Sequence, residues 1–213
     1  MNPRPGKLLC VGLNDADHAR ESNLALPKAP LCFAKWTTSL IGDGDEVLMP
    51  RATQQLDYEA ELAVVIGKTA LDVPVADALD YVAGYACFND LSTRDLQAAD
   101  GQWTRSKSFD TLGALGPIVP ATAVRDPQDL GIRCIVNGET LQDSNTSEMV
   151  FSVAEIIAYF SQDTTLEAGD VIATGTPAGI GLAQRPPRFL TDGDTVTVEI
   201  DRVGSITNRI RRR

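Results

Sequence analysis

Unbroken apolar runs, rather than helical repeats, dominate the hydrophobic pattern of this chain. Residues 62–66 are apolar without alternation, so we expect a strand that is buried on both faces. Residues 195–200 alternate in polarity, and Asn137-Gly138 is a strong signal for a tight hairpin turn. The pattern predicts strands over residues 8–13, 60–66, 84–88, 116–119, 132–136, 171–174 and 195–200.

Helical spacing is confined to a few short segments. Residues 75–82 have apolar residues at helical intervals. Ser152 and Glu155 form a capping box, which predicts an amphipathic helix running to about Phe160. A short helical turn also fits within residues 90–99. Because strands do not alternate regularly with long helices, we expect a β-rich α+β domain, not a doubly wound parallel sheet.

Size and charge narrow the class of protein. A chain of 213 residues suits a single domain over residues 1–213 that folds without disulfides. Its longest apolar run is far shorter than the roughly 20 residues of a membrane span. The net charge of -10 disfavours nucleic acid as a partner. Without a signal-peptide pattern or a C-x-x-C pair, we expect a cytosolic protein with reduced thiols.

Three carboxylates lie beside two of the predicted strands. Glu59 and Glu61 are two residues apart, so on a strand their side chains share one face. A solvated edge strand would carry them harmlessly, but the apolar run that follows predicts burial, where bare carboxylates are costly. Asp90 ends the next apolar run and, alone, would read as a turn residue. Together the three would make an all-oxygen site that favours Mg²⁺, Mn²⁺ or Ca²⁺.

Cationic and amide side chains follow Asp90. If this stretch is helical, Arg94 and Gln97 share a face with Asp90 and would suit a substrate with a carboxylate or carbonyl group. An exposed turn with an Arg94–Asp95 surface pair is the alternative. Lys107 is a lone lysine whose Ser, Phe and Asp neighbours do not resemble a solvated charge run.

A glycine-rich loop covers residues 173–181 after a predicted strand. It has neither the Gly-Lys-Ser/Thr ending of a P-loop nor the G-x-G-x-x-G order. It is either a plain tight turn or a loop whose backbone and Thr176 hydroxyl approach a ligand closely.

His18 is the only histidine of the chain, and Glu21 follows it by three residues. On a helical turn these two side chains face each other, and the carboxylate would orient the imidazole and raise its basicity. Surface His–Glu pairs usually have no function. An enzyme that uses histidine as its base, however, has only this one available.

Six stretches in this order resemble the fumarylacetoacetate hydrolase (FAH) family, and the similarity extends over nearly the whole chain. The first begins at Val11 and the last ends at Gly181. The stretches are VGLNDADHARES, DYEAELAVVIGK, GYACFNDLSTRDLQ, KSFDTLGALGP, VNGETLQDSNTSEMVFSV and LEAGDVIATGTPAGIG.

The resemblance implies an FAH-type mixed β-sandwich roll around a divalent metal, expected to be Mg²⁺, with Glu59, Glu61 and Asp90 as its ligands. It further implies a homodimer that acts on a small 2-oxo acid. The resemblance places near the substrate Arg94, Gln97, Lys107 and Thr176, and as a water-activating pair His18 and Glu21.

Two features bear on the substrate pocket. The family commonly has a tyrosine where this chain has Asp15, so the nearby loop is expected to differ in shape. The segment over about residues 14–30, which holds His18, is expected to act as a mobile lid. The chain also starts at a point that resembles the junction after the small N-terminal domain of longer members.

Family resemblance implies one leading reaction and two alternatives. The leading prediction is hydrolysis of a C–C bond in an acylpyruvate-like 2,4-dioxo acid, of acetylpyruvate or fumarylpyruvate type. It would pass through a pyruvate enolate stabilised by the metal and by Lys107, with water activated by His18 and Glu21. The alternatives are 2-hydroxyhepta-2,4-diene-1,7-dioate isomerisation and oxaloacetate-type decarboxylation. A metal-binding protein without turnover is disfavoured because every expected site residue is present.

Overall fold

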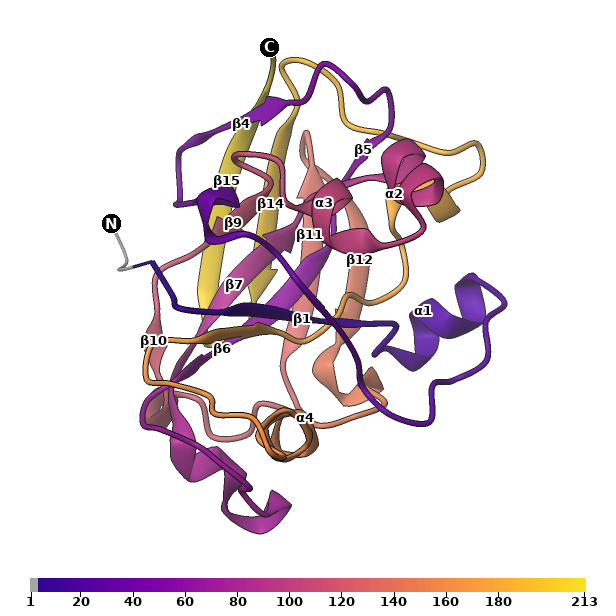
Figure 1. Cartoon of the computed structure of the whole chain (residues 1–213). Coiled ribbons are helices and arrows are strands. Elements are labelled where there is room, and N and C mark those ends of the chain that lie inside the picture. Colours follow the sequence, from indigo (N-terminus) through magenta and orange to yellow (C-terminus); the bar gives the residue numbers. More distant parts are fainter. Residues whose placement is uncertain (1–3) are drawn as a thin grey trace.

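Two β-sheets packed face to face form the framework of this computed structural model, which describes residues 4–213 (Figure 1). The larger sheet has the strand order β2-β1-β13-β6-β7-β9-β3, with β10 also paired to β7. The smaller has the order β12-β11-β14-β15-β4, and β5 pairs with β8 apart from both. The predicted β-rich α+β class is confirmed.

The strands in chain order are β1 (Leu8–Gly12), β2 (Leu31–Ala34), β3 (Leu40–Ile41), β4 (Glu46–Met49), β5 (Leu56–Asp57), β6 (Ala60–Ile66), β7 (Val82–Asp90), β8 (Ser92–Thr93), β9 (Gly113–Leu115), β10 (Val119–Pro120), β11 (Gly131–Val136), β12 (Glu139–Asn145), β13 (Val171–Ala173), β14 (Thr195–Ile200) and β15 (Gly204–Arg212). The α-helices are α1 (Ala16–Glu21), α2 (Arg94–Asp100), α3 (Trp103–Lys107) and α4 (Val153–Phe160). The 3₁₀ helices are η1 (Thr37–Ser39), η2 (Val75–Tyr81), η3 (Ala121–Ala123), η4 (Thr146–Glu148) and η5 (Gly181–Ala183).

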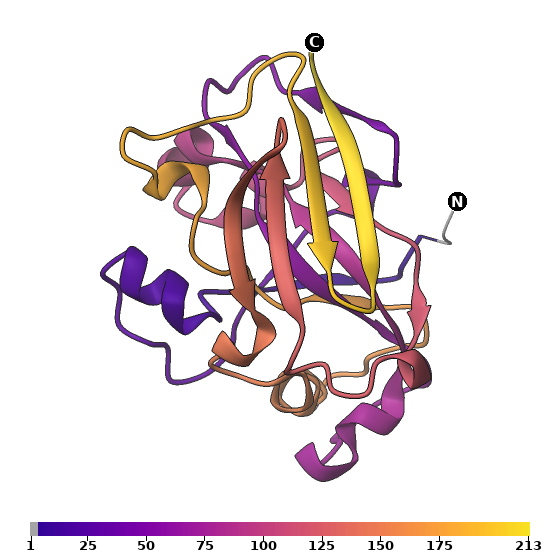
Figure 2. The ribbon, with the colours of Figure 1, turned by 180° about the vertical axis from the view of Figure 1, so that it is seen from behind.

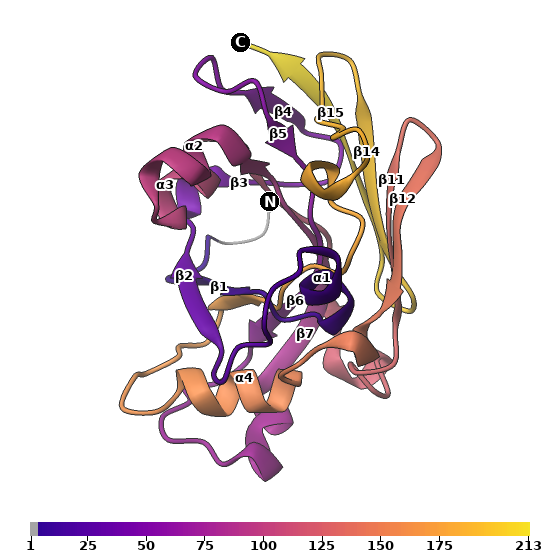
Figure 3. The same cartoon turned by 90° about the vertical axis from the view of Figure 1, so that its right-hand side faces the viewer.

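The antiparallel pair β6 and β7 lies at the centre of the larger sheet. Every residue of β6 is buried, as its apolar run predicts, because the smaller sheet covers one face and a second apolar cluster covers the other. Figure 3 shows the two sheets edge-on, with β6 and β7 between the smaller sheet and β1. Polar side chains at the end of this pair where β6 begins and β7 ends are therefore held inside the protein.

Local signals in the sequence account for several of the elements. Asn137 and Gly138 both have positive φ, as a two-residue type I′ turn requires, and they join β11 to β12 in the smaller sheet (Figure 2). Ser152 and Glu155 make both hydrogen bonds of the capping box at the start of α4. The predicted strands over residues 60–66 and 195–200 coincide with β6 and β14.

Two predicted elements differ from the structure. Residues 116–119 are not one strand, because β9 ends at Leu115 and β10 begins at Val119. Pro117 between them has no N–H for a sheet hydrogen bond. Residues 75–81 form the 3₁₀ helix η2, not an α-helix.

Short or half-polar strands at the sheet edges, such as β2, β4 and β12, are absent from the sequence-based prediction. The apolar runs of β2 and β4 are only four and three residues long, and β12 is mostly polar, so none has the pattern on which that prediction rests. Among the described residues, no helix is long and apolar enough to cross a membrane.

Candidate metal centre

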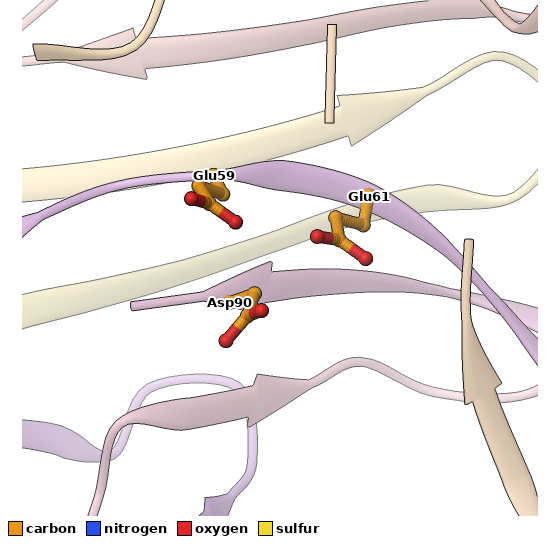
Figure 4. A group of neighbouring side chains, drawn as sticks. All are labelled: Glu59, Glu61 and Asp90. Carbon is orange, nitrogen blue, oxygen red and sulfur yellow. The ribbon is translucent and has the colours of Figure 1, made fainter. Parts of the chain in front are cut away.

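Three carboxylates meet where β6 begins and β7 ends. Glu59 immediately precedes β6, Glu61 lies within it, and Asp90 is the last residue of β7. Figure 4 shows the three side chains directed toward one another, and one oxygen from each lies within 4.8 Å of the others. Their residues are 6%, 1% and 0% exposed. As predicted, the side chains of Glu59 and Glu61 point to the same side, and the side chain of Asp90 meets them there.

Two lysines and an arginine surround these carboxylates. Lys107 Nζ lies 2.7 Å from Glu59 Oε2 and 2.8 Å from Asp90 Oδ2, so it bridges two members of the cluster. Lys35 Nζ donates to the other oxygen of Asp90 and to the carbonyl oxygens of Leu91 and Leu112. Both ammonium groups are buried, which costs them their hydration. Their ion pairs with the carboxylates offset this cost and fix their positions.

Arg94 links the cluster to a fourth buried carboxylate. Its Nη2 lies 2.7 Å from Glu59 Oε1, and its Nε donates to Asp57 Oδ2 at 2.8 Å. Its Nη1 donates to Gln97 Oε1 at 3.1 Å, so Arg94 and Gln97 share a face of α2 as predicted. Asp90 does not share this helical face, because it belongs to β7 and α2 begins only at Arg94. Asp57 also accepts hydrogen bonds from the backbone N–H groups of Gly181 and Leu182.

The charges of this cluster leave Glu61 without a cationic partner. Burial raises the pKa of Glu59, but Lys107 and Arg94 outweigh this effect and lower it to about 2. Burial, together with the charges of Asp90 and Glu59, raises the pKa of Glu61 well above its ordinary value. Glu61 is thus the carboxylate that most needs a further positive charge.

The donor set fits a divalent cation. The three carboxylates converge within coordination range of one point, all their donor atoms are hard oxygens, and four carboxylates face only three cationic side chains. Glu59, Glu61 and Asp90 would hold an ion such as Mg²⁺, Mn²⁺ or Ca²⁺. A cation there would relieve the repulsion that raises the pKa of Glu61.

The glycine-rich loop approaches the cluster through its backbone. The Gly175 N–H donates to Glu61 Oε2 at 3.0 Å. Gly175 has a φ of 105°, and a Cβ there would lie 2.8 Å from the Cβ of Asn14, so the close approach requires glycine. Thr176 Oγ1 donates to the carbonyl oxygen of Ala60, which positions its hydroxyl at the wall of the site.

His18 and Glu21 lie on the short helix α1. His18 Nδ1 is 3.5 Å from Glu21 Oε2, and Glu21 Oε1 accepts the Gly179 N–H of the glycine-rich loop. The predicted facing of the two side chains is observed. Figure 1 shows α1 at the side of the molecule. The proximity of His18 also contributes to the lowered pKa of Glu59, although less than Lys107 and Arg94 do.

A cavity of about 400 Å³ brings these elements together. Its buried lining combines charged side chains with the apolar Val11, Phe33 and Ile180, and its exposed lining includes leucines. Glu21 is not part of the wall but reaches it through His18. Of the predicted site residues, those that line it are His18, Glu59, Glu61, Arg94, Gln97, Lys107 and Thr176.

Comparison with known proteins decides the family. Residues 7–211 match the family described as "Fumarylacetoacetate (FAA) hydrolase C-terminal". This chain belongs to the fumarylacetoacetate hydrolase family.

Enzymes of several activities in this family are similar to the chain. "Oxaloacetate tautomerase Fahd2a, mitochondrial" from Rattus norvegicus is 45% identical over 209 residues, which span 97% of this chain and 67% of that protein. The 2-hydroxyhepta-2,4-diene-1,7-dioate isomerase from Mycobacterium marinum superposes with a TM-score of 0.87 at 38% identity, covering 99% and 76% of the two chains. Fumarylpyruvate hydrolase from Pseudomonas aeruginosa, in complex with Mn²⁺ and pyruvate, gives a TM-score of 0.88 at 32% identity, covering 97% and 90%. The chain is thus a member of an enzyme family with a carboxylate cluster suited to a divalent metal.

Three buried residues of this family member were missed by the sequence reasoning. Lys35 lies between Ala34 and Trp36, and Asp57 lies in a mixed stretch, so neither carries a local signal of burial. Gln142 lies on a strand with mostly polar neighbours. It donates to Thr176 Oγ1 at 2.9 Å and accepts from the Ala60 N–H at 2.9 Å, which ties the glycine-rich loop to β6.

Asp15, where the family commonly has tyrosine, is only 2% exposed. Its Oδ2 has no hydrogen-bond partner among the described residues. Burial, followed by the charges of Asp17 and Glu148, raises the pKa of Asp15 well above its ordinary value. The substitution therefore places an unpaired carboxyl group beside Gly175, at the base of the segment that carries His18.

Proposed function

We propose that this protein hydrolyses a C–C bond in an acylpyruvate-like 2,4-dioxo acid. One observation carries the proposal: His18, paired with Glu21, lines the same cavity as Glu59 and Glu61 of the carboxylate cluster. Hydrolysis needs both parts, because a water molecule must lose a proton while negative charge develops on the departing pyruvate.

Bound at Glu59, Glu61 and Asp90, a divalent cation such as Mg²⁺ would supply Lewis-acid chemistry toward the 2-oxo acid. Mn²⁺ and Ca²⁺ suit the same donors, and the Mn²⁺ in the Pseudomonas relative supports this choice of ion. Lys107, anchored between two of these carboxylates, would present its positive charge to the enolate oxygen of the leaving pyruvate. Arg94, Gln97 and Thr176 would bind and orient the substrate from the same wall.

The histidine would act as the general base. His18 Nδ1 has no hydrogen-bond partner among the described residues; a hydrogen bond from Nδ1–H to Glu21 would leave the lone pair of Nε2 for a proton from water. The resulting imidazolium would be stabilised by Glu21, and its proton would later return to the enolate carbon. The pair spans 3.5 Å within α1, so a change of side-chain rotamer would be needed to bring Nδ1 and the carboxylate within hydrogen-bond distance.

Acetylpyruvate turnover tests the proposal. Protein loaded with Mg²⁺ is expected to release acetate and pyruvate in equal amounts, and EDTA should abolish the release. The Glu139→Gln variant is a control, since this exposed carboxylate pairs with Arg188 on the surface. Retention of full activity in EDTA, or the absence of both products with Mg²⁺, would contradict the proposal.

Oxaloacetate tautomerisation is a second candidate, favoured by the identity of 45% to the rat tautomerase. The same residues would bind the 2-oxo acid, with His18 moving a proton at C3 rather than activating water. Isomerisation of a dienedioate, as in the name of the Mycobacterium marinum relative, and decarboxylation of oxaloacetate require the same enolate. Loss of enol-oxaloacetate absorbance without carbon dioxide release would indicate tautomerisation.

Three further properties remain predictions. A homodimer is expected from the family, and sedimentation equilibrium would measure it. A mobile segment over residues 14–30 would show as rapid hydrogen exchange of its backbone amides. The predicted cytosolic location is untested, and the rat relative carries a mitochondrial name.

A further inference from the structure

The outer part of the cavity is chemically unlike its inner wall. Its side chains come from separate segments: Leu24 and Leu31 flank the loop after α1, Leu182 lies in η5, and Trp103 lies in α3. Trp103 is braced edge-on by Phe33, with ring centroids 5.4 Å apart. Leu24, Leu31 and Leu182 are the exposed part of the lining, whereas Glu59, Glu61 and Lys107 are buried, and we call the exposed part the outer part of the cavity.

The three leucines are unusually exposed for apolar side chains that line a cavity. Leu24, Leu31 and Leu182 are 56%, 47% and 44% exposed, respectively. An apolar ligand seated among them would remove this surface from water, which is favourable in proportion to the area covered. Their convergence on one cavity distinguishes them from isolated surface leucines, which need no explanation.

The cationic side chains of the cavity are already engaged. Among its described lining residues, the permanent cations are Arg94 and Lys107. Arg94 pairs with Asp57 and Glu59, and Lys107 pairs with Glu59 and Asp90. A second carboxylate on the substrate, placed among these leucines, would lose part of its hydration without gaining a cationic partner, which is unfavourable.

We propose that the outer part of the cavity selects an uncharged aliphatic acyl group. The preferred substrates are then monocarboxylates with an alkyl tail, rather than dicarboxylates of the same length. This inference rests on the proposed function for the identity of the reaction, but the apolar subsite makes a claim about binding alone. Leu24, Leu31 and Leu182 are its specificity-determining residues.

Binding of unreactive 2-oxo acids separates this subsite from the reaction. Calorimetric titration with 2-oxooctanoate and 2-oxooctanedioate, each with Mg²⁺ present, compares ligands of one length that differ by a terminal carboxylate. Neither has the 4-oxo group at which hydrolysis would occur. The wild type should bind the monocarboxylate at least about tenfold more tightly. Affinity should also rise by about fourfold per methylene from 2-oxobutanoate until the outer wall is covered.

Charge substitutions on the wall sharpen the test. Leu182→Arg should reduce or reverse the preference for the monocarboxylate, and Leu31→Arg should do the same from the opposite segment. Leu71→Arg is the matched control, because Leu71 is a similarly exposed leucine outside the cavity and its substitution should leave the ratio unchanged.

The outcomes distinguish the two proposals. Equal or tighter binding of the dicarboxylate by the wild type would overturn the apolar subsite, whatever the reaction. An unchanged ratio in folded Leu182→Arg and Leu31→Arg proteins would also overturn it. A strong preference for the monocarboxylate in a protein that fails to release pyruvate from acetylpyruvate would support the subsite and refute only the hydrolytic reaction.

Discussion

The two sides of the cavity are built in opposite ways. The carboxylate cluster lies at the buried junction of β6 and β7, where ion pairs to Lys35, Lys107 and Arg94 connect every part except Glu61. His18 lies on a six-residue helix that the rest of the protein holds through a few polar contacts. Those contacts include Asn14 to Phe151 and Thr174, Asp17 to Ser144, Arg20 to Glu148, and Glu21 to Gly179. Asp15 also forms a β-bridge with Met149, and Ala19 is the buried residue of the helix.

The buried carboxylate cluster and the short helix that carries His18 suit two different requirements of the proposed reaction. Cation binding and charge stabilisation need side chains fixed in advance, since reorganisation during reaction would cost part of the stabilisation. Substrate entry and water placement need a segment that can open, and short exposed elements supply such motion. The four predictions below perturb one side at a time, in order of decreasing effect.

The largest effect is expected from Glu61→Gln in the cluster. The change removes the one ligand without a cationic partner, so Mg²⁺ affinity and Mg²⁺-dependent turnover should both fall, the latter by about 10³-fold or more. The metal-free variant should unfold at a higher temperature than metal-free wild type at neutral pH, because the raised pKa of Glu61 marks a destabilising buried charge. Calorimetry with Mg²⁺ and thermal unfolding measure these changes. Unchanged Mg²⁺ affinity would refute the site.

His18→Ala tests the side of the cavity that we propose to be mobile. Loss of a general base should lower kcat for acetylpyruvate by about 10²–10⁴-fold. Mg²⁺ affinity should stay within about twofold of the wild type, because His18 is not a ligand of the cluster. Steady-state kinetics and Mg²⁺ calorimetry on the same preparation provide the comparison. Equal turnover in the variant would remove His18 from the mechanism.

Asp15→Asn tests the base of that segment. The folded protein holds the Asp15 proton more tightly than the unfolded chain does, since the pKa of this buried carboxyl is raised. Wild-type stability should therefore fall as the pH rises above the ordinary Asp value of about 4. The variant should lack this loss and gain on the order of 1–3 kcal/mol relative to wild type by neutral pH.

Urea unfolding from pH 4 to pH 8 measures the Asp15 effect. Asp143→Asn is the control, because that side chain is 70% exposed and should leave the pH profile unchanged. Parallel profiles for wild type and Asp15→Asn would contradict the assignment.

The smallest effect is expected from Arg20→Ala. This exposed side chain pairs with Glu148 at 2.8 Å and links α1 to η4. Exposed ion pairs contribute at most about 1 kcal/mol, so turnover should change by no more than about fivefold. The difference from wild type should shrink at high salt. A loss as large as that of His18→Ala would show that α1 is held by this pair rather than free to move.

Local patterns explain which parts of the protein the sequence predicts well. The apolar run of β6 predicts burial, and alternation then places Glu59 and Glu61 on one face. The Asn-Gly turn and the capping box likewise act through neighbouring residues. These signals depend on backbone geometry within a few positions, so they can be predicted without knowing the contacts of distant residues.

Long-range partners explain what the sequence does not predict. Lys35 is 55 residues from Asp90, and nothing next to it indicates that its ammonium group is buried. Asp57 is held by hydrogen bonds from Arg94 and from the Gly181 backbone, and both donors are distant from it in the sequence. Family resemblance identified Arg94, Lys107 and Thr176 beyond what their local patterns could show, because it carries information about such contacts.

Comparing the rates of two reactions catalysed by one protein preparation tests the central claim most directly. The measurement is kcat/KM of Mg²⁺-loaded protein for release of acetate and pyruvate from acetylpyruvate, beside kcat/KM for conversion of enol-oxaloacetate to its keto form. The account predicts equal amounts of acetate and pyruvate, EDTA-sensitive release, and the larger kcat/KM for acetylpyruvate. Rapid tautomerisation of oxaloacetate without any acetate from acetylpyruvate would contradict it.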